Sequence, residues 1–497
     1  MSTTPTDEAL RDPLARRAFD RRMIQVGAVV VLGSLIAVLD VTIVYVATRA
    51  IGRDLGGSIS SVQWVLTGYM LAFAGIIPVT GWAIDRFGAK RVWIGALLVF
   101  MGASVLCGLA WSSGTLIAFR ILQGIGGGMI TPVGDALIVQ AAGPWRLGRV
   151  MSILGAPTLV GSVAGPVLGG LIVSSIGWRW IFLINVPLCI VAVLTAMWLL
   201  PRTSSGPRAR LDLRGLVLLT FGVAVFIYGM SETGGTGGFG GIRGSVELGV
   251  GTLLLALYGL HARALRGRAL IDLSLFRKRG FAAPAVLNLL FPVAMFGALL
   301  LFPLYWQIAA GQSPFATGVV MASLAFGSMV VLPLAGRLTD TVGAGLVVPG
   351  GVVLALLGLF VYAQAGVHAS RPVLVGALFV LGLGVGATNM PLTAAAYASL
   401  PRDVIPRAAS ALNTIKRLGA SIGTAVMAVV LQRAIVSEVP QLGDAALRPL
   451  APETRAGFAS GLAHAFSETF WLAFALTAIA LGPALYLPRN WRRRPRG

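Results

Sequence analysis

The stretch IPVTGWAIDRFG (77–88) returns later in the chain as LPLAGRLTDTVG (332–343), and this repeat decides how the sequence is organised. Both copies share one frame: Pro, two residues, Gly, three residues, Asp, two residues and Gly. The first copy supplies Pro78, Gly81, Asp85 and Gly88, and the second supplies Pro333, Gly336, Asp340 and Gly343. The match indicates two related halves within one chain.

The composition places these halves in a membrane. Of 497 residues, 56% are hydrophobic and only 11% are charged, and the mean hydropathy is +0.85. Soluble proteins carry about 25% charged residues, and a helix that spans a bilayer needs about 20 mostly apolar ones. We expect fourteen spanning stretches, at about 24–47, 61–84, 91–111, 114–141, 148–174, 179–200, 213–230, 246–264, 280–309, 314–336, 345–365, 371–398, 407–433 and 461–487.

The two copies of the repeat end the second and the tenth of these stretches, so eight helices separate equivalent points. With six helices in each half, the two extra ones lie between the halves. The sequence predicts an all-α integral membrane protein of two six-helix bundles plus two extra central helices, with a substrate site between the halves. The expected divisions are a basic tail (1–23), a first bundle (24–200), a linker with two helices (201–270), a second bundle (271–487) and a basic tail (488–497).

The positive charge of the chain is distributed unevenly. The formal net charge is +21, and most of the 39 Lys and Arg residues fall on one side if the N-terminus is cytoplasmic. This bias predicts a multi-pass protein of the cytoplasmic membrane with both termini in the cytoplasm. Basic tails next to helix ends also favour anionic lipid. We expect no nucleic-acid partner, because no separate basic domain is present.

Five motifs in order resemble the major facilitator superfamily, specifically its fourteen-span drug:proton antiporters. They are LDVTIV (39–44), GWAIDRFGAKR (81–91), RILQG (120–124), GSVAGPVLGG (161–170) and WRWIFLINVP (178–187). The sequence departs from the family pattern after the first motif, where Tyr45 and ATR (47–49) replace Asn and Ala-Leu-Pro. The resemblance implies export of amphipathic drugs or antibiotics by alternating access, driven by protons.

Two of these motifs predict moving parts. The loop motif is expected to form a cytoplasmic latch from Gly81, Asp85, Arg86, Gly88 and Arg91, with Asp340 in a weaker second copy. Its basic residues, Lys90 included, are expected to pair with Asp85 or lipid headgroups; a merely topogenic loop is the alternative. The helix-5 motif offers Gly161, Gly165, Pro166, Gly169 and Gly170, which allow close helix approach and bending. Ordinary packing without motion is the alternative there.

Asp40 stands inside the first apolar stretch. A carboxylate at a helix centre costs about 2.5–3.5 kcal/mol on insertion scales, so a partner must offset it. Counting from the outer surface, Asp40 and Arg120 differ in depth by about 3 Å at 1.5 Å per residue. We therefore expect Asp40 to pair with Arg120, directly or through Gln123 or water, and to carry a proton when it loses that partner. A static buried ion pair is the alternative.

Other polar and aromatic residues complete the expected site. Asp135 lies nearer the cytoplasmic end of the fourth stretch, either as a second proton site, as an attraction for cationic substrates, or as a residue that only reaches the surface or a neighbouring Arg. Aromatic rings bind lipophilic cations by stacking and cation–π contact. The expected substrate cavity includes Gln123, Trp64, Tyr69, Gln307, Asn413 and Arg417, although Trp64 also fits an interfacial belt.

The sequence gives no reason to expect an enzyme, a cofactor or a metal. GASIG (419–423) and GTGGFG (235–240) match a hydrolase and a dinucleotide pattern, but neither follows a predicted strand. His261, His368 and His464 are scattered. We expect a secondary exporter that acts as a monomer on a small amphipathic molecule, with protons and lipid as its other partners. Export of an endogenous metabolite or lipid, and a non-transporting membrane sensor, remain open at this point.

Overall fold

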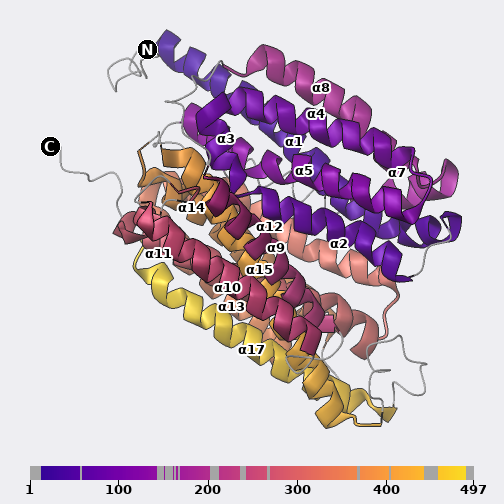
Figure 1. The fold of residues 1–497 in the computed structure, drawn as a ribbon. Helices are drawn as coiled ribbons and strands as arrows, with labels where there is room; N and C mark the ends of the chain where they lie inside the picture. Colours follow the sequence, from indigo (N-terminus) through magenta and orange to yellow (C-terminus); the bar gives the residue numbers. More distant parts are fainter. Residues whose placement is uncertain are drawn as a thin grey trace. The chain divides into compact units, whose positions relative to one another are not determined.

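The computed structural model describes residues 13–55, 59–142, 150, 161, 164–165, 168–201, 212–235, 242–265, 269–271, 273–365, 370–401, 404–441 and 457–487. Every regular element within these ranges is a helix (Figure 1). The chain divides into two compact units, Met1–Arg210 and Leu211–Gly497.

The described residues of the first unit form mostly apolar helices. They are α1 (Pro13–Asp54), α2 (Ile59–Ile76), α3 (Val79–Phe87), α4 (Ala89–Gly108), α5 (Ser113–Ala142), α7 (Trp180–Leu183) and α8 (Asn185–Leu199). α5 packs along both α2 and α4, and α1 packs against α5 and α8. Residues 168–175 are also helical.

The second unit begins with α9 (Leu213–Gly235) and α10 (Ile242–Ala264), which pack against each other and, through α9, on α15. They fall in the segment that the sequence analysis assigns to a two-helix linker. Asp212 fastens this hairpin: its Oδ1 accepts a hydrogen bond from the Gly215 amide at 2.9 Å and lies 2.8 Å from His261 Nε2. The remaining elements are η4 (Leu273–Arg277), α11 (Arg279–Leu304), η5 (Tyr305–Ala309), α12 (Pro314–Val342), α13 (Ala344–Ala363), α14 (Arg371–Ala398), α15 (Ile405–Glu438) and α17 (Ala459–Leu485).

Twelve helices in the described ranges are long and apolar enough to span a membrane. A thirteenth span is counted if the pair 64–76 and 79–87, bent by 55°, is one broken helix. The expected stretch at 148–174 lies largely outside the described residues, so the number fourteen stays a prediction. The chain is a multi-pass membrane protein of all-helical fold.

The two repeat copies adopt the same backbone at their final glycines. Gly88, between α3 and α4, has φ 83° and ψ 146°, and Gly343, between α12 and α13, has φ 94° and ψ 155°. A residue with a Cβ rarely adopts this region. The turn predicted at Gly88 is therefore present, and its counterpart in the second half has the same form.

The copies differ at their prolines. The chain breaks between α2 and α3 at Pro78, whereas Pro333 lies inside the continuous helix α12. At the break, both the hydroxyl and the amide of Thr80 donate to the Ile77 carbonyl, at 2.6 and 3.1 Å. The equivalent residue of the second copy is Ala335, which has no hydroxyl.

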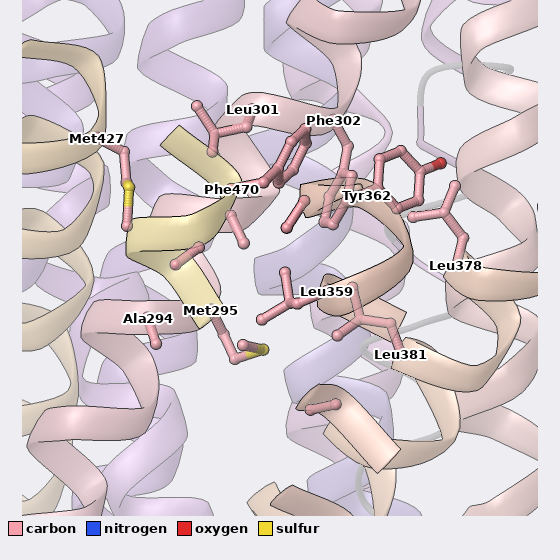
Figure 2. Packing of buried hydrophobic residues seen from close by; sticks show 14 of the residues in the cluster. Ala294, Met295, Leu301, Phe302, Leu359, Tyr362, Leu378, Leu381, Met427 and Phe470 are labelled. Atoms are coloured by element: carbon pink, nitrogen blue, oxygen red, sulfur yellow. The ribbon is translucent and has the colours of Figure 1, made fainter. Parts of the chain in front are cut away.

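An aromatic core holds the second unit together. Phe302, Tyr362 and Phe470 come from α11, α13 and α17 and are buried against one another, with ring centroids 4.8–5.2 Å apart (Figure 2). Trp306 donates its indole N–H to the Tyr362 hydroxyl at 3.1 Å, and that hydroxyl donates to the Leu374 carbonyl at 3.2 Å. The polar ends of these rings are thus satisfied inside an apolar core.

Replacement of either turn glycine by alanine is expected to destabilise the protein. Gly88→Ala or Gly343→Ala forces a Cβ into a backbone region that costs about 1–3 kcal/mol. The matched controls are Gly95→Ala in α4 and Gly350→Ala in α13, where an added methyl meets nothing within 4 Å. Thermal unfolding of the purified protein should show a lower Tm for the first pair only. Equal Tm values for all four variants would contradict the requirement for glycine at the two turns.

Candidate functional site

Asp40 lies on α1 with no exposed surface and accepts three hydrogen bonds. Arg120 Nη1 donates to its Oδ2 at 2.7 Å. Gln123 Nε2 and Asn185 Nδ2 donate to its Oδ1 at 2.9 and 3.0 Å. The carboxylate is therefore bound by side chains from α5 and α8, and the predicted pairing of Asp40 with Arg120 and Gln123 is present.

Arg120 has other partners besides the carboxylate. Its Nε donates to the Val65 carbonyl at 3.3 Å, and its Nη1 also donates to Gln123 Oε1 at 2.5 Å. Its guanidinium lies 4.0 Å from the centre of the Tyr69 ring, a cation–π contact. Tyr69 is fully buried at this point, so its ring is a platform for the arginine.

Gln123 connects the charged pair to α4. Its Nε2 donates to Ser104 Oγ at 2.7 Å as well as to Asp40, and the Ser104 hydroxyl donates to the Phe100 carbonyl at 2.8 Å. Close packing brings the helices together here. A methyl group at Gly126 of α5 would lie 2.6 Å from the Phe100 amide nitrogen, so only a glycine fits that contact.

Hydrogen bonding decides whether such a pair is tolerable. Burying two charges costs several kcal/mol per ion, and mutual attraction offsets this only when the remaining polar atoms also have partners. Both Asp40 oxygens and two Arg120 nitrogens, Nε and Nη1, meet that condition. Asp40, Arg120, Gln123, Asn185 and Ser104 form a buried, hydrogen-bonded group within the first unit of the protein; we call it the Asp40 cluster.

The sequence analysis did not identify two residues of the Asp40 cluster. Asn185 and Ser104 have 1% and 0% exposed surface, and both contact the centre directly or through Gln123. Asn185 stands within WRWIFLINVP as an amide in an apolar run, which is the signal that could have found it. Ser104 gave no such signal, because small hydroxyl residues are common in membrane helices.

The helix-5 glycines lie against α1 beside Asp40. A methyl at Gly161 would touch Val38, one at Gly169 would touch Ile43, and one at Gly165 would overlap Oγ1 of Thr42. The Thr42 hydroxyl also lies 3.3 Å from the Gly161 carbonyl. The predicted close approach is thus made to the turns of α1 that flank Asp40. Gly170 faces open space, and Pro166 lies outside the described residues.

The predicted latch residues of the first copy lie in α3, in α4 and at Gly88 between them. Asp85 and Arg86 are partly buried and Arg91 is exposed, while Gly81 is buried in α3 and Asp340 is 6% exposed in α12. Lys90 bonds in a way that the sequence analysis did not foresee. Its Nζ donates to the carbonyls of Met197 and Leu200 at 2.6 and 2.7 Å, which caps the C-terminal end of α8.

The remaining predicted residues come from α2, α5, η5 and α15. Asp135 is partly buried fifteen residues beyond Arg120 on α5, or about 22 Å along the helix axis at 1.5 Å per residue. Trp64, at the start of α2, is 38% exposed. In the second unit, Gln307 and Arg417 are partly buried on η5 and α15, and Asn413 is buried on α15 and donates to the Ala409 carbonyl at 2.9 Å. Their roles stay predictions.

Asp54 forms an ion pair where α1 ends. Arg179 Nη1 and the Trp178 indole nitrogen donate to its Oδ2 at 2.6 and 3.0 Å. The Arg179 guanidinium also lies 4.4 Å from the Trp178 ring centre. These hydrogen bonds, that of Arg179 first, lower the pKa of Asp54 below its ordinary value. The pair joins the end of α1 to the turn before α7.

A bundle of membrane-spanning helices with a buried carboxylate–guanidinium pair is the arrangement of a membrane transporter rather than an enzyme. The comparisons agree: the sequence profile of the Major Facilitator Superfamily matches residues 30–424. The chain belongs to this superfamily of transporters.

Relatives and solved structures extend this assignment. The "Multidrug resistance protein B homolog" of Mycobacterium tuberculosis is 36% identical over 99% of this chain and 96% of its own length. The "Putative multidrug resistance protein MdtD" of Escherichia coli is 30% identical over 81% and 85%. In fold, the chain is similar to the human organic anion transporter MFSD10, with a TM-score of 0.61 and 16% identity over 92% of this chain and 99% of that one. It is also similar to the proton:xylose symporter XylE, with a TM-score of 0.62 and 14% identity over 93% of this chain and 95% of that one.

The helix-5 glycine beside Thr42 provides a test of the packing around Asp40. Gly165→Ala places a methyl against Thr42, and overpacking of this kind costs about 1–3 kcal/mol. We expect a lower Tm and slower transport. Gly170→Ala is the matched control, since its methyl meets nothing within 4 Å. Equal behaviour of the two variants would show that this contact does not constrain α1.

The Asp54 ion pair predicts a specific pH dependence. Because its folded-state pKa is lowered, its stabilising contribution is present above the ordinary carboxyl pKa of about 3.9 and is lost as the pH falls through the lowered value. The Tm difference between wild type and Asp54→Asn should therefore stay constant from about pH 7 to 5 and shrink only in stronger acid. In an Arg179→Gln background the difference should nearly vanish. A difference that disappears between about pH 7 and 5.5 would contradict the lowered pKa.

Proposed function

We propose that the protein is a proton-coupled exporter of amphipathic drugs or antibiotics. Two observations support the drug efflux part: membership of the superfamily, and relatives of 36% and 30% identity that carry multidrug resistance names over most of the chain. The proton-coupled part rests on the Asp40 cluster. The proposed setting is the cytoplasmic membrane, with both termini in the cytoplasm and a monomer as the working unit.

The proposal rests on one observation: Arg120 has hydrogen-bond and cation–π partners besides Asp40. When Asp40 takes up a proton, its attraction for the guanidinium falls. Arg120 still keeps the Val65 carbonyl and the Tyr69 ring, while Gln123 Oε1 is the acceptor that can move to Asp40. A buried arginine without acceptors would be costly, so these partners lower the cost of neutralising Asp40. The pair can change its protonation state without unfolding the bundle.

Gln123 is the residue that adapts the cluster to a protonated Asp40. At present its amide nitrogen donates to Asp40 and its amide oxygen accepts from Arg120. A protonated carboxyl group carries a donor of its own, which needs an acceptor. Rotation of the Gln123 amide by half a turn presents its oxygen to Asp40. Release of the proton reverses this step and restores the bonds described above.

The contacts that hold α1 support a coupling between proton exchange at Asp40 and transport of the substrate. The helix-5 glycines pack on α1 at Val38, Thr42 and Ile43, on either side of Asp40. A change in the Asp40 bonds moves or frees this segment of α1 relative to its neighbours. A proton then favours one access state and the substrate favours the other, because each binds one state more tightly.

The decisive experiment measures proton flux driven by drug in proteoliposomes. Asp40→Asn keeps the size of the side chain but cannot exchange a proton at neutral pH, so drug-dependent flux should fall to the level of empty liposomes. Asp54→Asn is the matched control on the same helix and should retain flux. Size-exclusion chromatography checks that both variants are folded, and Asp40→Glu provides a titratable second variant. Undiminished flux in Asp40→Asn would overturn the proton-coupling role.

A further inference from the structure

Three metal-ligating side chains meet between the ends of two helices of the second unit. Glu438 is the last residue of α15, and His464 and Glu468 lie one turn apart near the start of α17. His464 Nδ1 lies 3.1 Å from Glu438 Oε1 and 3.9 Å from Glu468 Oε1. One ligand atom from each of the three residues lies within 4.8 Å of the others.

The packing of α17 fixes this arrangement. A methyl group at Gly461 would lie 2.7 Å from Val439 Cγ2 and 3.2 Å from the Glu438 carbonyl oxygen, so the glycine allows α17 to approach the end of α15 closely. Phe466 and Phe470 have no exposed surface and hold the opposite face of α17 in the aromatic core. The side of α17 that carries His464 and Glu468 is thereby turned toward Glu438.

We propose that Glu438, His464 and Glu468 form a binding site for a divalent transition-metal ion of the zinc type. Metal–ligand distances of about 2.0–2.2 Å place adjacent ligand atoms roughly 3–3.6 Å apart, so small rotamer changes close the site. Two carboxylates balance the charge of the ion. An imidazole nitrogen favours Zn²⁺ over Ca²⁺ and Mg²⁺, which prefer oxygen ligands alone.

Exposure allows the ion to enter and to keep water ligands. The side chains of His464, Glu468 and Glu438 are 60%, 52% and 34% exposed. The site lies at the end of α17 remote from the C-terminus, which is the outer face in the orientation predicted from the charge bias. An ion there fastens the end of α15 to the start of α17. A bound ion therefore acts on α15, the helix that also carries the expected substrate-cavity residues Asn413 and Arg417.

The sequence analysis expected no metal for a reason that the fold removes. It treated the histidines as scattered, and Glu438 and His464 stand well apart in the chain. Only the pairing of α15 with α17 brings them together. The spacing of His464 and Glu468, four residues apart on a helix, was visible in the sequence but lacked a third ligand.

The experiment is a calorimetric titration of the purified full-length protein, stripped with EDTA and freed of any affinity tag, with ZnCl₂, CaCl₂ and MgCl₂. We expect one Zn²⁺ per chain, with weaker binding of Ca²⁺ and Mg²⁺, and a Zn²⁺-dependent rise in Tm. His464→Gln and Glu468→Gln should each weaken Zn²⁺ binding by about tenfold or more. Glu438→Gln is a further variant in case either of these fails to fold.

His261→Gln and Glu232→Gln are the matched controls, since they remove a histidine and a carboxylate elsewhere in the second unit and should leave Zn²⁺ binding unchanged. Zn²⁺ affinity equal in wild type and the site variants would overturn the proposal. So would affinity for Ca²⁺ equal to that for Zn²⁺, or no binding heat at all, which would leave an ordinary hydrogen-bonded His–Glu pair. None of these readouts depends on transport activity, so the result is independent of the function proposed above.

Discussion

The ion pair between Asp40 and Arg120 is the interaction on which the first unit depends. Asp40 and Arg120 have 0% and 1% exposed surface, and among the described residues the next most buried charged side chain is Asp340, at 6%. Each charge in a spanning helix costs about 2.5–3.5 kcal/mol on insertion scales. The helices around the pair must therefore bring polar atoms to it, and α2, α4, α5 and α8 each supply at least one group.

Small residues make that convergence possible. Gly126 allows α5 to approach α4, and Gly165 allows the helix-5 segment to approach Thr42 on α1. Lipid offers little hydrophobic driving force between helices, so close van der Waals contact and interhelical hydrogen bonds hold the bundle together. In the second unit, aromatic packing around Tyr362 holds the helices together, and the Tyr362 hydroxyl is hydrogen-bonded to Trp306 and Leu374.

The sequence predicted the parts of this structure that follow from local patterns. Apolar length located the helices, the repeat marked two equivalent points in the chain, and counting depth along two helices paired Asp40 with Arg120. The remaining features depend on tertiary packing. Asn185 reaches Asp40 only because α8 packs on α1, Lys90 caps α8 only because α4 lies beside it, and Tyr69 contacts Arg120 only because α2 packs on α5. Neither residue type nor spacing encodes such neighbours.

On the proposed function, the buried pair changes its protonation state, and its energetics are compatible with that role. A buried ion pair is close to neutral in net free energy, because desolvation cancels most of the attraction between the charges. A conformational equilibrium near balance is one that a ligand of modest differential affinity can shift. The extra partners of Arg120 reduce the penalty for neutralising Asp40, whereas a pair without them would resist protonation. On the proposed function, Val65, Gln123 and Tyr69 are thus as important to proton exchange as the carboxylate itself, since they set how far the equilibrium lies from balance.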